Sequence, residues 1–65
     1  MRLIDLIKNI KYKRTYMLII NNDKIIIWSG TLGELFTSVF LDKYMNYELN
    51  DVSFDKFGNY YIRIE

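Results

Sequence analysis

The stretch TYMLIINNDKIIIW, residues 15–28, decides the fold of this chain. It contains two runs of mainly aliphatic, β-branched and aromatic residues, 15–20 and 24–28, which favour strands. The Asn-Asn-Asp cluster at 21–23 tolerates the geometry of a tight turn. The stretch therefore predicts a β-hairpin.

Both runs carry apolar side chains on each of their two faces. In the first run Tyr16, Leu18 and Ile20 occupy one face, and Met17 and Ile19 occupy the other. A hairpin with one face in water alternates apolar with polar residues. We therefore expect cover on both faces of this hairpin, from helices or from another copy of the chain.

Helices are predicted on either side of the hairpin. Residues 2–10 place apolar side chains at three- and four-residue steps, the spacing of a short amphipathic helix. Thr31 and Glu34 have the spacing of a capping box, which marks the start of a second helix that extends to about residue 42 or 44. Its expected apolar face consists of Leu32, Leu35, Phe36, Val39 and Phe40.

A second hairpin is predicted at the end of the sequence. Residues 48–54 alternate weakly, residues 55–59 supply Gly and Asn for a turn, and residues 60–65 alternate cleanly. The expected order is helix, strand, strand, helix, strand, strand. The sequence thus predicts an α+β fold (αββαββ) in a single domain, 1–65, with a small antiparallel sheet packed with helices.

The composition favours an oligomeric binding protein over an enzyme. A domain of this size buries only about 60% of its unfolded surface, yet 51% of the 65 residues are hydrophobic and 17% are aromatic. Without Cys or His, the chain lacks disulfides, a Cys/His zinc site and the usual catalytic bases and nucleophiles. We therefore expect a homo-oligomer that needs no metal or cofactor and has no enzymatic activity.

The sequence predicts a cytoplasmic protein. No run approaches the ~20 consecutive apolar residues of a membrane span. Asp5 stands too early for a secretory signal. We therefore expect no membrane partner.

The densest basic segment alternates with aromatic residues. Lys11, Tyr12, Lys13 and Arg14 combine cations, which contact phosphates, with a ring on which a base can stack. The alternative is a solubilising connector between a helix and a strand, whose tyrosines belong to the core.

A second candidate lies where a strand leads into a helix. Trp28, Ser29, Gly30 and Thr31 precede the predicted helix start, where free backbone N–H groups favour an anion. Gly30 permits close approach of a ligand. The alternatives are helix capping without any ligand and, for Trp28, a place in the core or in an interface.

The charge is unevenly distributed along the chain. Residues 1–33 carry six basic and two acidic side chains, and residues 34–65 carry three basic and six acidic ones. Such polarity steers a partner or pairs one protomer with the next. The net charge of +1 argues against an extended nucleic-acid-binding surface.

The element GTLGEL, residues 30–35, follows the second predicted strand. Together with the leading helix and the closing hairpin, it resembles small accessory proteins of phages and prophages of low-GC Gram-positive bacteria. The abundance of Ile, Lys, Asn and Tyr is similarly typical of an AT-rich genome. The resemblance implies a role in blocking host defence, by binding a defence protein or by sequestering a nucleotide signal.

The preferred hypothesis is a non-enzymatic phage-type anti-defence protein in the host cytoplasm. It acts stoichiometrically, as a homo-oligomer that sequesters a nucleotide-like signalling ligand. The alternative is a protein inhibitor of a host defence enzyme, similar to anti-CRISPR proteins, and a weaker alternative is a nucleic-acid-binding module. The candidate ligand-binding residues are Lys11, Tyr12, Lys13, Arg14, Trp28, Ser29, Gly30 and Thr31.

Overall fold

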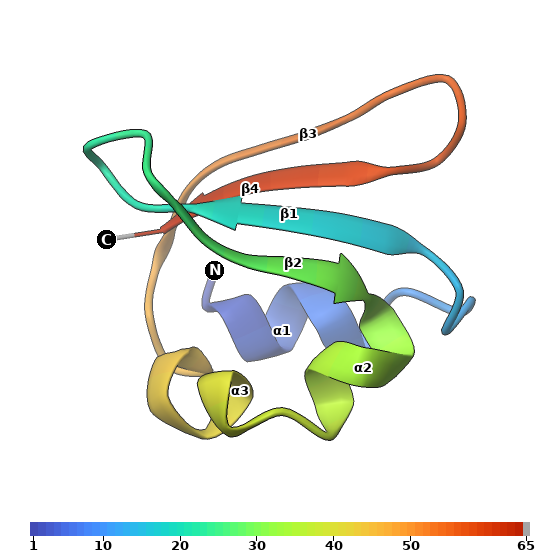
Figure 1. The fold of residues 1–65 in the computed structure, drawn as a ribbon, viewed down its shortest axis with the longest axis horizontal. Helices are drawn as coiled ribbons and strands as arrows, with labels where there is room; N and C mark the ends of the chain where they lie inside the picture. The colour runs from blue at the N-terminus through green and yellow to red at the C-terminus, as the bar shows by residue number, and fades with distance from the viewer. Residues whose placement is uncertain (65) are drawn as a thin grey trace.

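The computed structural model describes residues 1–64 and has the predicted α+β class, with helices and strands in one small body (Figure 1). Its elements in chain order are α1 (Leu3–Lys8), β1 (Tyr16–Ile20), β2 (Ile26–Thr31), α2 (Leu32–Phe36), α3 (Val39–Tyr44), β3 (Leu49–Phe54) and β4 (Tyr60–Ile64). Both predicted hairpins form, but β2 extends to Thr31 instead of ending at the predicted residue 28. The last predicted strand residue, Glu65, lies outside the described residues.

The sheet is mixed, whereas the sequence predicted a wholly antiparallel one. Its strand order is β2-β1-β4-β3, with antiparallel pairs within each hairpin and a parallel pair, β1 with β4, at the centre. The segment containing α2 and α3 carries the chain from one edge of the sheet to the other. It returns the second hairpin in an orientation that pairs the two inner strands in parallel.

The helices lie on one side of the sheet and enclose the core with it (Figure 1). The strand side chains that face them alternate along the inner strands, as the pleat requires. The helix α1 packs within its own chain, because Leu3 and Ile7 are fully buried there. The buried core consists of Leu3, Ile7, Met17, Ile19, Leu32, Leu35, Leu41, Ile62 and Ile64.

The second predicted helix is in fact two short helices, α2 and α3. The Ser38 hydroxyl accepts a hydrogen bond from the backbone N–H of Leu41 at 3.3 Å, and it donates to the carbonyl of Leu35 at 2.7 Å. Ser38 therefore caps a new helix rather than continuing the old one. The break shifts the helical phase, so that Val39 is 85% exposed and Leu41 is buried. The predicted apolar face was wrong at Val39 for this reason.

Within residues 1–64, no helix lies on the opposite side of the sheet (Figure 1). On this side the central strand β1 presents Leu18 and Ile20, which are half-buried among their neighbours. The sequence predicted cover on both faces of the first hairpin. Within a single chain, residues 1–64 supply that cover on one face only.

Replacing Gly30 with Ala should destabilise the fold, and Gly33 provides the matched control. Gly30 has φ +152°, and a Cβ there would lie 2.9 Å from Cη2 of Trp28. We expect Gly30→Ala to lower the free energy of unfolding by about 2 kcal/mol. A Cβ at Gly33 would lie 3.4 Å from the Lys13 carbonyl oxygen, an ordinary contact, and Ala improves helix propensity by up to about 1 kcal/mol. Urea unfolding measures both variants, and equal losses would contradict the packing of Trp28 over Gly30.

Candidate functional site

A hollow joins the basic segment to the turn of the second hairpin. We call it the basic–aromatic hollow, and its volume is about 530 Å³. This size falls within the range of about 300–1,000 Å³ that is usual for small-molecule sites. Its lining residues are Asn9, Ile10, Lys11, Tyr12, Arg14, Thr15, Tyr16, Phe57, Gly58, Asn59 and Tyr60.

One wall of the hollow is the connector between α1 and β1. A turn closes within it, where the backbone N–H of Thr15 donates to the carbonyl of Tyr12 at 3.1 Å. The carbonyl of Thr15 in turn accepts from Leu32 at 2.8 Å, and the carbonyl of Lys13 accepts from Gly33 at 2.9 Å. The connector is therefore held against the start of α2 by its backbone, which leaves its side chains available for a ligand.

The other wall is the turn between β3 and β4, and Asp55 organises it. One carboxylate oxygen accepts from the backbone N–H groups of Phe57 at 2.9 Å and Asn59 at 3.0 Å. The second oxygen accepts from the Tyr61 hydroxyl at 3.0 Å. Burial alone raises the pKa of the Asp55 carboxyl, but the hydrogen bonds from Asn59, Tyr61 and Phe57 outweigh it and hold this pKa below its ordinary value of 3.8. The turn is thus fixed by an ionised carboxylate.

The charge of the hollow favours an anion. Lys11 and Arg14 contribute two cations, and none of its lining residues within the described part of the chain is acidic. The carboxylate of Asp55 is directed into its own turn, where hydrogen bonds already engage it. Tyr12 is 75% exposed and Phe57 is 77% exposed, so both rings are accessible. Cations beside accessible rings are the combination that holds phosphates and stacks bases.

The helix start at Thr31 has its donors already engaged. The N–H groups of Leu32 and Gly33 donate to connector carbonyls, and the N–H of Glu34 donates to the Thr31 hydroxyl at 3.3 Å. The Glu34 carboxylate accepts from the backbone N–H of Thr31 at 2.9 Å, and this bond, with a second from the Thr31 hydroxyl, lowers the pKa of Glu34. The free N–H groups that the sequence suggested for an anion are therefore used within the chain, and the capping alternative describes this segment.

The other candidates of the segment 28–31, Trp28 and Ser29, lie on opposite faces of the sheet. Trp28 lies on the helix side of the sheet, where its ring stacks on Phe40 at a centroid distance of 6.1 Å. Ser29 pairs with Leu18 and so belongs to the opposite face. Of the eight predicted residues, the hollow therefore brings together Lys11, Tyr12 and Arg14, while Lys13 and residues 28–31 lie outside its lining.

Besides Asn9, Ile10, Thr15 and Tyr16, which adjoin the basic segment, the lining residues 57–60 were not among the predicted site residues. They lie more than 40 residues from the basic segment, and only the turn-forming Gly and Asn drew attention to them. The parallel pairing of Met17 with Tyr60 brings the start of β1 next to the start of β4. Strand order, which the sequence does not reveal, therefore completes the site.

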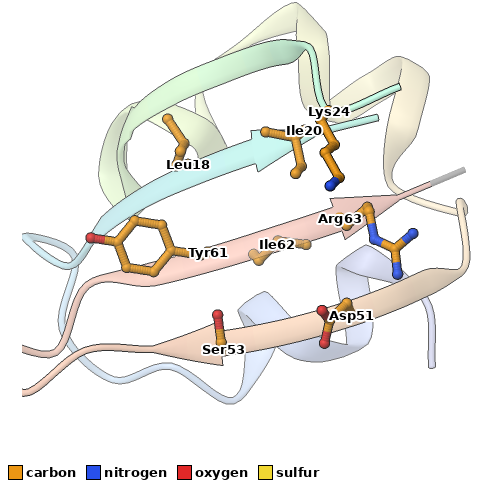
Figure 2. Close-up of a pocket in the computed structure, with 8 residues that line it drawn as sticks. All are labelled: Leu18, Ile20, Lys24, Asp51, Ser53, Tyr61, Ile62 and Arg63. Atoms are coloured by element: carbon orange, nitrogen blue, oxygen red, sulfur yellow. The ribbon is translucent and has the colours of Figure 1, made fainter. Parts of the chain in front are cut away.

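A second concavity, of about 450 Å³, lies on the helix-free side of the sheet (Figure 2). Leu18 and Ile20 form its apolar part on β1. The charged groups gather at one end, and Tyr61 and Ser53 lie at the other end (Figure 2). Its lining residues are Leu18, Ile20, Lys24, Asp51, Ser53, Tyr61, Ile62 and Arg63.

Comparison of the chain with known protein families, curated proteins and solved structures finds no match. Within residues 1–64, no helix has the length and apolar character needed to cross a membrane. The same residues contain no group of three or more His, Cys, Asp or Glu side chains placed to hold a metal ion.

The turn that walls the hollow should make stability depend on pH in the acid range. Because the folded pKa of Asp55 lies below 3.8, its stabilising contribution is complete above that value and is lost as pH falls through the folded pKa. The free energy of unfolding should therefore drop between roughly pH 4 and pH 2 by more in the wild type than in Asp55→Asn. Urea unfolding at several pH values measures this difference. Identical acid slopes would contradict the role of the Asp55 carboxylate.

Proposed function

We propose that this chain is a non-enzymatic binding protein that holds a nucleotide-like anion in the basic–aromatic hollow. In this proposal it acts stoichiometrically, as a homo-oligomeric phage-type accessory protein that sequesters a nucleotide signal from host defence. The observation that supports the ligand class is the joint lining of one hollow by Lys11, Arg14 and accessible rings, with no acid among its described lining residues.

The two chemical parts of a nucleotide match the two kinds of group in the hollow. Lys11 and Arg14 suit phosphate oxygens, because Arg offers a bidentate fork and Lys a point charge. The exposed rings of Tyr12 and Phe57 suit a base, since stacking on an aromatic ring contributes about 1–3 kcal/mol per base. The hollow is open to solvent, so a nucleotide can enter without a change in the fold.

Nucleotide binding should depend on Arg14 and not on a cation elsewhere. We expect isothermal titration with nucleoside triphosphates and cyclic dinucleotides to give a measurable Kd. Arg14→Ala should raise the Kd of the tightest-binding ligand about tenfold or more, because a charge-assisted hydrogen bond is worth about 1.5–3 kcal/mol. The matched control is Lys43→Ala on α3, whose ammonium lies 5.2 Å from the Tyr44 ring and outside the hollow. Absence of binding at roughly 100 µM, or equal loss in both variants, would refute the proposal.

A second candidate function, inhibition of a host protein, is favoured by the hairpin of β3 and β4. Phe54 is 71% exposed and Phe57 is 77% exposed, and the hairpin extends away from the helices (Figure 1). Exposed aromatic side chains are typical anchors of protein interfaces.

The inhibitor function predicts that Phe54 and Phe57 carry the affinity for a host protein. A host protein retained on the immobilised chain should be lost with Phe54→Ser/Phe57→Ser and kept with the control Val39→Ser, which also removes an exposed apolar side chain. Equal retention by both variants would exclude the hairpin as the contact.

A further inference from the structure

The helix-free side of the sheet has an ordered pattern of side chains, which we call the open face. Registers across the four strands define two rows that span the sheet. The first row is Ile26, Ile20, Arg63 and Asp51, and the second row is Ser29, Leu18, Tyr61 and Ser53. The aliphatic pair at the centre of the face, Leu18 and Ile20, belongs to the same strand that buries Met17 and Ile19 on its other side.

Among residues 1–64, the charged side chains of the open face form no ion pair. Among the described residues, the ion pairs join Met1 to Glu48 and Arg2 to Asp5, so Lys24, Asp51 and Arg63 take part in none. Asp51 stands directly across from Arg63 in the ladder, yet the two side chains do not close an ion pair. The face thus presents an aliphatic centre with both signs of charge available at one end (Figure 2).

We infer that the open face is covered by the open face of a second copy. The two copies are related by a two-fold axis that lies in the plane of the interface, perpendicular to the strands and midway between the two rows. This symmetry lays each strand over its own counterpart and exchanges the rows. Ile20 then faces Leu18 of the other copy, Arg63 faces the Tyr61 ring, Asp51 faces the Ser53 hydroxyl, and Ile26 faces Ser29 at the edge of the sheet. Each contact occurs twice, as an isologous interface requires.

Three of the four exchanged contacts are chemically complementary. Ile20 meets Leu18, the guanidinium of Arg63 lies over the ring of Tyr61 as a cation–π pair, and the hydroxyl of Ser53 donates to the carboxylate of Asp51. A two-fold axis along the strands would instead place Arg63 over Ile20 and Asp51 over Ile26. That arrangement buries both charges without partners, which is costly.

The area of the open face predicts a weak dimer, whose population depends on the protein concentration. Four strands spaced ~4.8 Å apart and rising ~3.3 Å per residue span roughly 20 Å in each direction. The area is therefore smaller than the ~800 Å² that each partner contributes to a standard interface. This dimer is the homo-oligomer of the proposed function, and the inference rests on that function in this respect. Dimerisation does not require a nucleotide, because the basic–aromatic hollow lies at the end of the sheet.

The mass of the free protein in solution tests the interface without any ligand. We expect light scattering at roughly 200 µM to give twice the chain mass of 7.9 kDa, with return to one chain on dilution. Leu18→Lys should give one chain throughout, and the control Val39→Lys, on the helix layer, should behave as the wild type. A wild type of one chain, or a Leu18→Lys variant that keeps the double mass, would overturn the inference. A one-chain wild type that binds a different protein through Leu18 would overturn the inference as well.

A charge exchange tests the axis. Tyr61→Lys should dissociate the dimer, because it sets a cation opposite Arg63 of the other copy, and Arg63→Glu/Tyr61→Lys should restore it through reciprocal ion pairs. Failure of the double variant to dimerise, with near-native circular dichroism, would overturn this symmetry.

Titration of the monomeric Leu18→Lys variant with the nucleotide panel separates the two proposals. Retained nucleotide binding by this variant would support the hollow, whatever mass the light scattering shows.

Discussion

The parallel pairing of β1 with β4 is the contact on which the rest of the structure depends. It joins two hairpins that would each be marginal alone, and it aligns Ile19 with Ile62 so that both are buried beneath the helices. The same pairing sets Met17 beside Tyr60 and thereby brings the basic connector to the last turn. Both surfaces proposed for binding are therefore consequences of one strand pair.

Local patterns predicted the elements well, because each depends on residues close in sequence. The hairpin of residues 15–28 follows from two strand-forming runs around a turn, and the start of α2 follows from the Thr31–Glu34 capping box, which forms as predicted. The break at Ser38 was missed because a Ser within an apolar periodicity is compatible with both a continuing helix and a new cap. The parallel pair was missed because strand order depends on contacts between distant segments.

The candidate site was predicted only in part, because local patterns do not reveal contacts between distant segments. Lys11 and Arg14 were recognised by type and local density, and these properties do not depend on the fold. The helix start was assigned free donors, but the connector carbonyls and the Thr31 hydroxyl accept those hydrogen bonds. Apolar residues on both faces of the first hairpin predicted cover on each face. Residues 1–64 cover one face, and cover of the open face, with Leu18 at its centre, stays a prediction.

The central claim is that the connector and the last turn form one ligand site, and amide chemical-shift mapping tests it most directly. Titration of the isotopically labelled protein with a nucleoside triphosphate or cyclic dinucleotide should shift the amides of Lys11, Arg14, Asn59 and Tyr60 together with one apparent Kd. Shifts confined to the segment 28–31, or shifts in the connector without any in the last turn, would contradict the account.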